Sequence, residues 1–209
     1  AQVAERQGTL TAAFEALARV QTAIFDKTGT LTEGTPQVVE IAPAPGLFEA
    51  DVLAAAARAE TGVLHPLAKA VIARHGAEVG NGGTRLERGA LAEDEAGRIV
   101  SVTGSAADVG TTRLLVTRDG ETLGTLDLVD RLRPEAAGLI ECLKTSGISI
   151  LIATGDSKGP ALAVGGKLGL EADSVRFGCT AHDKADLIAR SVRPVLFVGD
   201  GVNDAPALA

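Results

Sequence analysis

The sequence contains no Met, Trp or Tyr, only two Cys, and no long apolar run. Its apolar stretches fall far short of the roughly 20 residues that a transmembrane helix requires, so no membrane span is expected. Cys142 and Cys179 lack Cys-x-x-Cys spacing, which argues against a structural zinc site or a disulfide framework and favours a reducing compartment. Because no Met is present as an initiator, we expect the 209 residues to be part of a longer polypeptide.

Positive charge is also scarce. The sequence has 20 Lys and Arg against 27 Asp and Glu, a formal net charge of -7 and a pI of about 5.0. A nucleic-acid surface needs clustered Lys and Arg, and no such cluster is visible, so we expect no nucleic-acid partner. The length suits one large domain or two modest ones.

Three apolar runs each lead into an acidic motif. The aspartates are Asp26, Asp156 and Asp200, and the runs before them occupy residues 20–25, 148–153 and 195–198. Continuous runs of Val, Ile and Leu predict strands that are buried on both faces of a parallel sheet. Because parallel strands end at the same edge, the three aspartates are expected to meet in one crevice.

A group of carboxylates needs a cation to offset its charge. Oxygen ligands suit Mg²⁺, which keeps several waters and takes further ligands from phosphate, so the pattern predicts a magnesium site. A simpler alternative for a single Asp after a strand is that it opens a turn, and for Asp204 that it caps a helix. The repetition of the pattern favours the metal site.

One domain is expected to be interrupted by another. Residues 1–36 and 126–209 would form the acidic domain, and residues 37–125 an insert that opens with Pro43-Ala44-Pro45-Gly46, a linker-like segment. Because two strands tether the insert, we expect it to swing about hinges near residues 35–36 and 126–127.

Apolar spacing and breaker residues predict the main elements. Strands are expected at residues 98–103, 113–117 and 122–128, and helices at residues 49–58, 66–76, 134–146, 161–168 and 184–191. Asp119-Gly120 predicts a hairpin turn. Gly165 and Gly166 disfavour the helix predicted over residues 161–168, because glycine costs about 1 kcal/mol relative to Ala in a helix interior. We account for them only by close packing.

The run Asp26-Lys27-Thr28-Gly29-Thr30-Leu31-Thr32 resembles the phosphorylation motif of the P-type cation-transporting ATPases. Thr154-Gly155-Asp156, Gly199-Asp200-Gly201-Val202-Asn203-Asp204 and the run from Asp130 to Pro134 match further motifs of that family, and the resemblance covers essentially the whole chain. It implies an α/β fold: a haloacid-dehalogenase-like, Rossmann-type parallel sheet as phosphorylation domain, with an inserted small α+β nucleotide-binding domain.

The resemblance also implies roles for the residues of the acidic site. Asp26 would attack the γ-phosphoryl of ATP and become an aspartyl-phosphate. Lys184 would bind the phosphate, and Mg²⁺ would be held by the Asp26 carboxylate, the Thr28 carbonyl and Asp200. Thr154 and Gly155 would donate hydrogen bonds, from a hydroxyl and an N–H, to the phosphoryl oxygens. Asn203 and Asp204 would orient the ligands of the ion. The remaining catalytic positions are Lys27, which brings positive charge, and Asp156.

Thr28 separates two kinds of enzyme on this scaffold. Haloacid-dehalogenase-like phosphatases usually place a second Asp two residues after the nucleophile, as general acid and base. Thr cannot accept a proton near neutral pH, so a phosphorylated intermediate should persist. A long-lived intermediate suits a pump.

Features of the insert resemble the nucleotide domain of the heavy-metal-transporting (type IB) branch. Leu64-His65-Pro66-Leu67 is similar to its His-Pro motif, and Glu60 stands where that branch has an adenine-contacting Glu. Gly89 stands where it usually has Gly-x-Gly, with Leu91 in place of the second glycine, and would let backbone approach the nucleotide. The alternative is that His65 is an ordinary surface residue at a helix start.

These resemblances imply the cytoplasmic ATP-binding region of a heavy-metal P-type ATPase, in which ATP hydrolysis drives metal export. The region would be soluble at the cytoplasmic face of the plasma (inner) membrane, and would reach the membrane and the transported cation through helices outside this chain. The residues before His65 lack the Ser-Glu of many copper pumps, which favours Zn²⁺, Cd²⁺ or Co²⁺. Alternatives are a copper transporter, a stand-alone phosphohydrolase of this fold, or a non-catalytic regulatory module.

Overall fold

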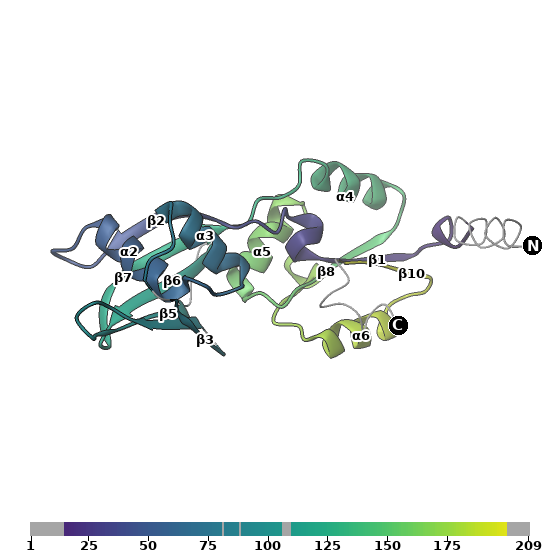
Figure 1. Ribbon diagram of the computed structural model, residues 1–209. Coiled ribbons are helices and arrows are strands. Elements are labelled where there is room, and N and C mark those ends of the chain that lie inside the picture. The colour runs from purple at the N-terminus through teal and green to yellow at the C-terminus, as the bar shows by residue number, and fades with distance from the viewer. Residues whose placement is uncertain (1–14, 81, 88, 106–109, 200–209) are drawn as a thin grey trace, which may run out of the picture. The chain divides into compact units, whose positions relative to one another are not determined.

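The computed structural model describes residues 15–80, 82–87, 89–105 and 110–199 (Figure 1). The chain divides into two compact units. We call Ala1–Thr32 with Leu132–Ala209 the parallel-sheet unit, and Glu33–Arg131 the inserted unit. Within the described ranges, no helix combines the length and the apolar character that crossing a bilayer requires.

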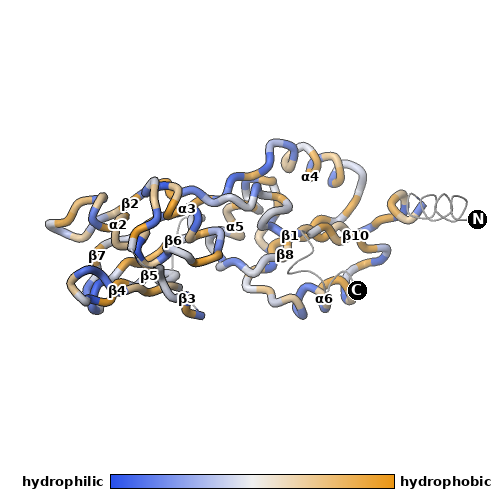
Figure 2. The backbone as a smooth tube through the Cα atoms, in the orientation of Figure 1, coloured by the Kyte–Doolittle hydropathy of each residue, from blue (hydrophilic) through white to orange (hydrophobic). Residues whose placement is uncertain are grey.

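The parallel-sheet unit is built on a four-stranded sheet with the order β10-β1-β8-β9, in which every pair is parallel. Its strands are β1 (Thr22–Asp26), β8 (Ser149–Ala153), β9 (Val175–Arg176) and β10 (Val195–Val198). All of β1 is buried, as expected for a strand with neighbours on both sides, and Figure 2 shows the hydrophobic colouring of this part of the sheet. The prediction of parallel strands from the apolar runs is confirmed.

The strand register brings the acidic motifs to one edge of the sheet. Asp26 pairs with Ala153 at the end of β8, and Phe25 pairs with Val198 at the end of β10. The chain therefore leaves three neighbouring strands at the same level, immediately before or at the predicted aspartates. Asp200 lies outside the described residues.

The helices of the parallel-sheet unit connect its strands. They are α4 (Ala136–Thr145), α5 (Lys158–Lys167), the short η2 (Ala172–Ser174) and α6 (Ala181–Arg190). Ile140 of α4 and Ile152 of β8 are fully buried in their common core. A Cβ at Gly165 would lie 2.5 Å from Val175 Cγ2, so the packing of α5 against β9 explains this glycine, whereas nothing in the structure explains Gly166.

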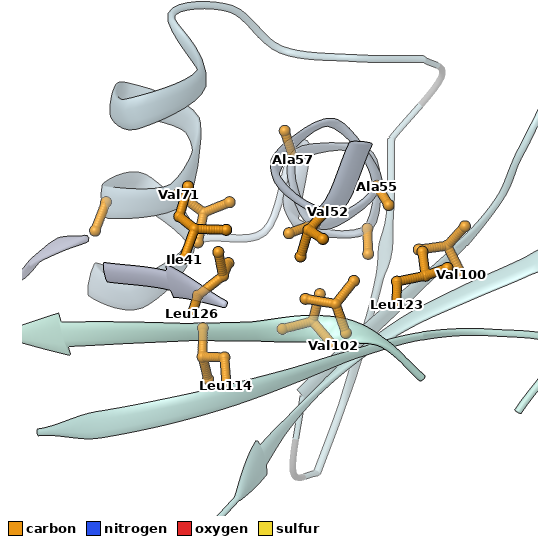
Figure 3. Close-up of a cluster of buried hydrophobic side chains, with 14 of the residues drawn as sticks. Ile41, Val52, Ala55, Ala57, Val71, Val100, Val102, Leu114, Leu123 and Leu126 are labelled. Carbon is orange, nitrogen blue, oxygen red and sulfur yellow. The ribbon is translucent and has the colours of Figure 1, made fainter. Parts of the chain in front are cut away.

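The inserted unit is a six-stranded antiparallel sheet with the order β2-β7-β6-β5-β4-β3. Its strands are β2 (Gln37–Pro43), β3 (Thr84–Leu86), β4 (Gly89–Glu93), β5 (Ile99–Ser105), β6 (Thr112–Arg118) and β7 (Glu121–Val129). Two helices, α2 (Glu49–Glu60) and α3 (Pro66–His75), pack on it. Figure 3 shows Val52 of α2 above Val102 and Leu126 of the sheet, and all three side chains are fully buried.

Several local predictions for the inserted unit are confirmed. Helix α3 begins at Pro66 and ends before Gly76, which adopts the left-handed conformation with φ 94°. Asp119 and Gly120 both have positive φ, 49° and 85°, as a tight hairpin between β6 and β7 requires. Strands β2, β3 and β4 were not predicted, and Pro43, taken as part of a linker, is the last residue of β2.

The boundary between the units differs from the prediction. The crossings lie between Thr32 and Glu33 and between Arg131 and Leu132, rather than after residues 36 and 125. Residues 126–127, expected to form a hinge, lie inside β7 and pair with both β2 and β6, so that hinge prediction is wrong. The physical reason is that β7 continues to Val129, held by ladder hydrogen bonds on both sides.

Candidate active site

Asp26 ends the central strand of the parallel sheet, with only 7% of its surface exposed. The Lys184 ammonium donates a 2.7 Å hydrogen bond from Nζ to Asp26 Oδ1, and Lys184 is itself 5% exposed. A carboxylate at this position can act as a nucleophile, and the neighbouring cation can stabilise an anionic group that becomes attached to it. The structure thus brings together two predicted catalytic residues that are 158 positions apart in the chain.

The first turn of α6 positions Lys184. Thr180 caps the helix: its Oγ1 accepts a 3.2 Å hydrogen bond from the Asp183 N–H, and Asp183 Oδ2 accepts hydrogen bonds from the Thr180 hydroxyl and N–H at 2.7 and 2.8 Å. These hydrogen bonds from Thr180 lower the pKa of Asp183. The reciprocal pair satisfies backbone N–H groups that a helix start would otherwise leave without partners, so α6 begins three residues before the predicted position.

The segment after Asp26 is a closed turn, η1 (Lys27–Leu31). Gly29 has φ 77°, a left-handed conformation that glycine adopts without a steric penalty. The buried Thr32 hydroxyl donates to the Lys27 carbonyl at 3.1 Å and accepts from the Gly29 N–H at 3.3 Å. Gly29 and Thr32 of the motif therefore define the shape of the loop that follows Asp26.

Arg133 also holds this loop. Its guanidinium donates to the carbonyls of Gly29 and Thr30 at 3.1 Å each, and its backbone N–H donates to the Leu31 carbonyl at 2.9 Å. The run that contains Arg133 matches a family motif, but no role at the site was predicted for this residue. An Arg-Pro pair just before a predicted helix was the available signal.

Asp156 lies beside the residues that follow Asp26. Its Oδ2 forms an ion pair with Lys27 Nζ and accepts a 3.4 Å hydrogen bond from the Thr28 hydroxyl. Thr154, 1% exposed, accepts a 3.1 Å hydrogen bond at Oγ1 from the Asp156 N–H, which shapes the turn after β8. The motifs after β1 and β8 are therefore joined by side chains.

The described part of the predicted catalytic set lies within the parallel-sheet unit. Asp26, Lys27, Thr28, Thr154, Asp156 and Lys184 are linked by the contacts above, and Gly155 lies between two of them. Asn203 and Asp204, like Asp200, lie outside the described residues. Among the residues that are described, no group of three or more His, Cys, Asp or Glu side chains is arranged so that it could hold a metal ion. The Asp26 carboxylate and the Thr28 carbonyl are nonetheless oxygen donors of the kind that Mg²⁺ accepts.

The inserted unit carries a second group of predicted site residues. Glu60, the last residue of α2, is 6% exposed, and its burial raises its pKa from 4.5 to about 7 against the opposing effect of Arg85. His65 caps α3, where its Nδ1 accepts a 3.3 Å hydrogen bond from the Leu67 N–H, and Pro66 occupies the first helical turn. Burial, and next the charge of Arg85, lower the pKa of His65. A neutral imidazole that accepts at Nδ1 carries its proton at Nε2, so His65 offers a donor.

The fold itself requires glycine at position 89. Gly89 has φ 150°, and a Cβ there would lie 2.0 Å from the Val102 carbonyl oxygen on the neighbouring strand β5. Its contact with a nucleotide stays a prediction. Arg85 on β3 was missed in the sequence, although its charge acts on both Glu60 and His65. A lone Arg on a three-residue strand carries no recognisable sequence signal.

Comparison with known proteins places these features in a family. Residues 20–209 match the family described as haloacid dehalogenase-like hydrolase. A zinc/cadmium/lead-transporting P-type ATPase of Escherichia coli (strain K12) is 37% identical over 98% of this chain and 31% of its own length. A copper-transporting P-type ATPase of Rhizobium leguminosarum bv. viciae is 37% identical over 94% of this chain and 26% of its own length. The chain spans between a quarter and a third of the length of these relatives.

Solved structures agree with this assignment. A zinc-transporting PIB-type ATPase in the E2.Pi state aligns with a TM-score of 0.71 and 36% identity, over 94% of this chain and 36% of that one. The catalytic domain of the CPx-ATPase CopB-B, studied for conformational changes upon nucleotide binding, aligns with a TM-score of 0.76 and 27% identity, over 95% of this chain and 81% of that one. The chain belongs to the haloacid dehalogenase-like hydrolase family, and its similarity within that family is to the catalytic region of heavy-metal P-type ATPases.

Proposed function

We propose that the chain is the ATP-binding catalytic region of a heavy-metal-transporting P-type ATPase. In this proposal ATP hydrolysis through an aspartyl-phosphate on Asp26 drives export of a metal cation by a longer protein. The observation that carries the proposal is the buried contact between Asp26 and Lys184 at the end of the central strand. The similarity to P-type ATPases over nearly the whole chain supports it.

The phosphoryl transfer follows from what each side chain can do. An Asp26 carboxylate oxygen attacks the γ-phosphorus of ATP, the bond from that phosphorus to the bridging oxygen breaks, and ADP leaves. Lys184 offsets the negative charge that gathers on the phosphoryl oxygens, and the buried Thr154 hydroxyl is a candidate donor to them. Mg²⁺, when bound through Asp26, the Thr28 carbonyl and Asp200, would supply further charge neutralisation.

The alternative of a stand-alone phosphohydrolase needs a general base close to Asp26. Thr28 occupies the position where such phosphatases usually carry that base, and its hydroxyl donates to Asp156. Because Thr cannot take a proton from water near neutral pH, the aspartyl-phosphate should outlive the transfer step. Persistence of the intermediate is the property that distinguishes the two functions.

A phosphorylation assay tests this proposal. The chain is incubated with Mg²⁺ and ATP labelled at the γ-phosphate, then quenched in acid. We expect label that is stable in acid and released by hydroxylamine, and we expect Asp26→Asn to abolish it. Asp173→Asn, which changes an exposed Asp of the same unit, is the matched control. Equal labelling of the Asp26→Asn and Asp173→Asn variants would show that Asp26 is not the nucleophile.

We further propose that the inserted unit binds ATP through Glu60, His65 and Gly89. The two perturbed side chains at the junction of α2 and α3 support this assignment, because ligand sites are where burial and charge alter titration. Calorimetric titration with ATP should show loss of binding for His65→Ala. His75→Ala, at the other end of α3, should bind like the unmodified chain.

The transported ion stays a proposal as well. The sequence favoured Zn²⁺, Cd²⁺ or Co²⁺, and a relative named for zinc, cadmium and lead supports that preference. A copper-transporting relative has the same identity, 37%, so the copper alternative is retained. Metal-stimulated ATPase activity of the full-length protein across a panel of ions would decide between them.

A further inference from the structure

Arg85 lies near the proposed ATP site but is not one of the three residues assigned to it. It lies on β3, the strand at one edge of the six-stranded sheet (Figure 1), and pairs with Ala90 of β4. Residues that face each other across antiparallel strands have their side chains on the same face. Ala90 is fully buried against Val63 and Ala68, which lie on either side of His65 in the sequence, so Arg85 is on the sheet face that carries the start of α3.

The backbone holds β3 close to Glu60 as well. The Gly83 N–H donates a 2.7 Å hydrogen bond to the Thr61 carbonyl, directly after Glu60. A Cβ at Gly83 would lie 1.8 Å from the Ala59 carbonyl oxygen, so the approach to β3 is pressed against the end of α2. This packing is why the charge of Arg85 acts on both Glu60 and His65.

The charge of Arg85 is also available to a ligand. The inserted unit has six more acidic than basic residues, and its ion pairs engage Arg58, Arg98, Arg113 and Arg118. The Arg85 side chain is exposed and makes no hydrogen bond or salt bridge to any residue that the structure describes. ATP carries several negative charges, so it would be repelled by this acidic unit unless a cation stood beside the site.

We propose that Arg85 is a specificity-determining residue of the inserted unit, whose guanidinium binds the phosphate chain of a nucleotide held at Glu60 and His65. This inference rests on the proposed ATP site. Glu60 and His65 would contact the base, and the long Arg85 side chain would reach the phosphates from the sheet edge. Charge-assisted bonds from a guanidinium to phosphate are among the stronger polar contacts in proteins.

Calorimetric titration of the 209-residue chain with ATP, ADP, AMP and adenosine, without Mg²⁺, tests the inference. Arg85→Gln should weaken ATP binding about tenfold while adenosine binding changes by less than about twofold. Arg85→Lys should recover part of the affinity for ATP, because it restores the charge without the planar fork. Raised salt should weaken ATP binding to the unmodified chain more than to Arg85→Gln. Arg74→Gln, which removes an exposed cation from the last turn of α3, is the matched control and should change nothing.

The outcomes separate this inference from the proposed site. If the unmodified chain binds neither ATP nor adenosine, the proposed site fails and the inference fails with it. If the chain binds both but Arg85→Gln binds ATP as before, the site stands and Arg85 has no part in it. An equal loss of ATP and adenosine would place the guanidinium at the base or ribose and would overturn the phosphate assignment. Circular dichroism spectra that match the unmodified chain show that each variant is folded.

Discussion

Replacing Glu60 with Gln should stabilise the inserted unit by an amount that grows from pH 4.5 and reaches its full value above about pH 7. Glu60 is nearly buried at the end of α2, and burial raises its pKa from 4.5 to about 7. Between these two pH values the folded chain keeps the proton while the unfolded chain loses it. The free energy of unfolding therefore falls as the pH rises from 4.5 to about 7, and then levels off.

The size of the effect follows from the same two values. A change from 4.5 to about 7 corresponds to about 3 kcal/mol as an upper limit. Water at the edge of α2 screens the charge, so we expect Glu60→Gln to gain about 1–2 kcal/mol at pH 8. Near pH 4 the carboxyl is protonated in both states, and the substitution should then change the free energy of unfolding by less than about 0.5 kcal/mol.

The measurement must report on the inserted unit alone. The chain has no Trp or Tyr, so intrinsic fluorescence provides no sensitive probe, and circular dichroism averages the two units. Native-state hydrogen exchange at the buried amides of Val100 and Val102 in β5 measures the opening free energy of this unit. Glu93→Gln, an exposed site on β4, is the control and should behave alike at both pH values. A Glu60→Gln gain that is equal at pH 4 and pH 8 would refute the argument from burial.

Three further substitutions test the parts of the site and of the fold. Lys184→Met should destabilise the parallel-sheet unit by about 3 kcal/mol in urea unfolding, because it removes one member of a buried ion pair with Asp26. Gly89→Ala should destabilise the inserted unit by about 3 kcal/mol, measured by hydrogen exchange without nucleotide, because its Cβ would meet the Val102 carbonyl. Arg133→Gln should slow phosphorylation about tenfold while costing only about 1 kcal/mol of stability; unchanged labelling kinetics would leave its contacts with the loop without a catalytic role.

The sequence predicted the elements whose residues carry strong local signals. Strands β1 and β8 are continuous apolar runs because both have neighbours on each side, and that burial leaves few positions for polar residues. Pro66 and Gly76 mark the ends of α3 because each residue suits the backbone conformation at its own end of a helix. In each of these elements, the local structure restricts which residue types can occupy a position, so the residue itself indicates the structure.

Elements without such signals were missed. Strand β2 is an edge strand with mostly exposed side chains, and it ends at Pro43, so its pattern was not that of a buried strand. The crossing predicted near residues 126–127 falls inside β7, where Asp127 is a polar residue within a strand. It is 6% exposed, and the guanidinium of Arg113 on β6 binds it through two 2.6 Å hydrogen bonds. Such a compensation between strands cannot be recognised before the pairing is known.

For the candidate site, the sequence predicted where the main residues lie but not the contacts between them. The strand ends and their motifs located Asp26 and Asp156 correctly at one edge of the sheet, but spacing alone could not show what joins them. The ion pair between Lys27 and Asp156 spans more than a hundred residues of sequence, as do the bonds from Arg133 to the loop. These contacts come from tertiary packing. Sequence patterns therefore identify the residues that gather at the site but not which of them contact one another.

These contacts also bear on why an aspartyl-phosphate would persist. A base that activates water must lie beside the phosphoryl group, and Thr28 stands at the usual position for it. Asp156 is the carboxylate bound to Thr28, but its Oδ2 already accepts from that hydroxyl and faces the ammonium of Lys27. In this arrangement Asp156 braces the loop rather than receiving a proton from water. Under the proposed function, the described residues would form the intermediate, and a base supplied from elsewhere in a longer protein would control its hydrolysis.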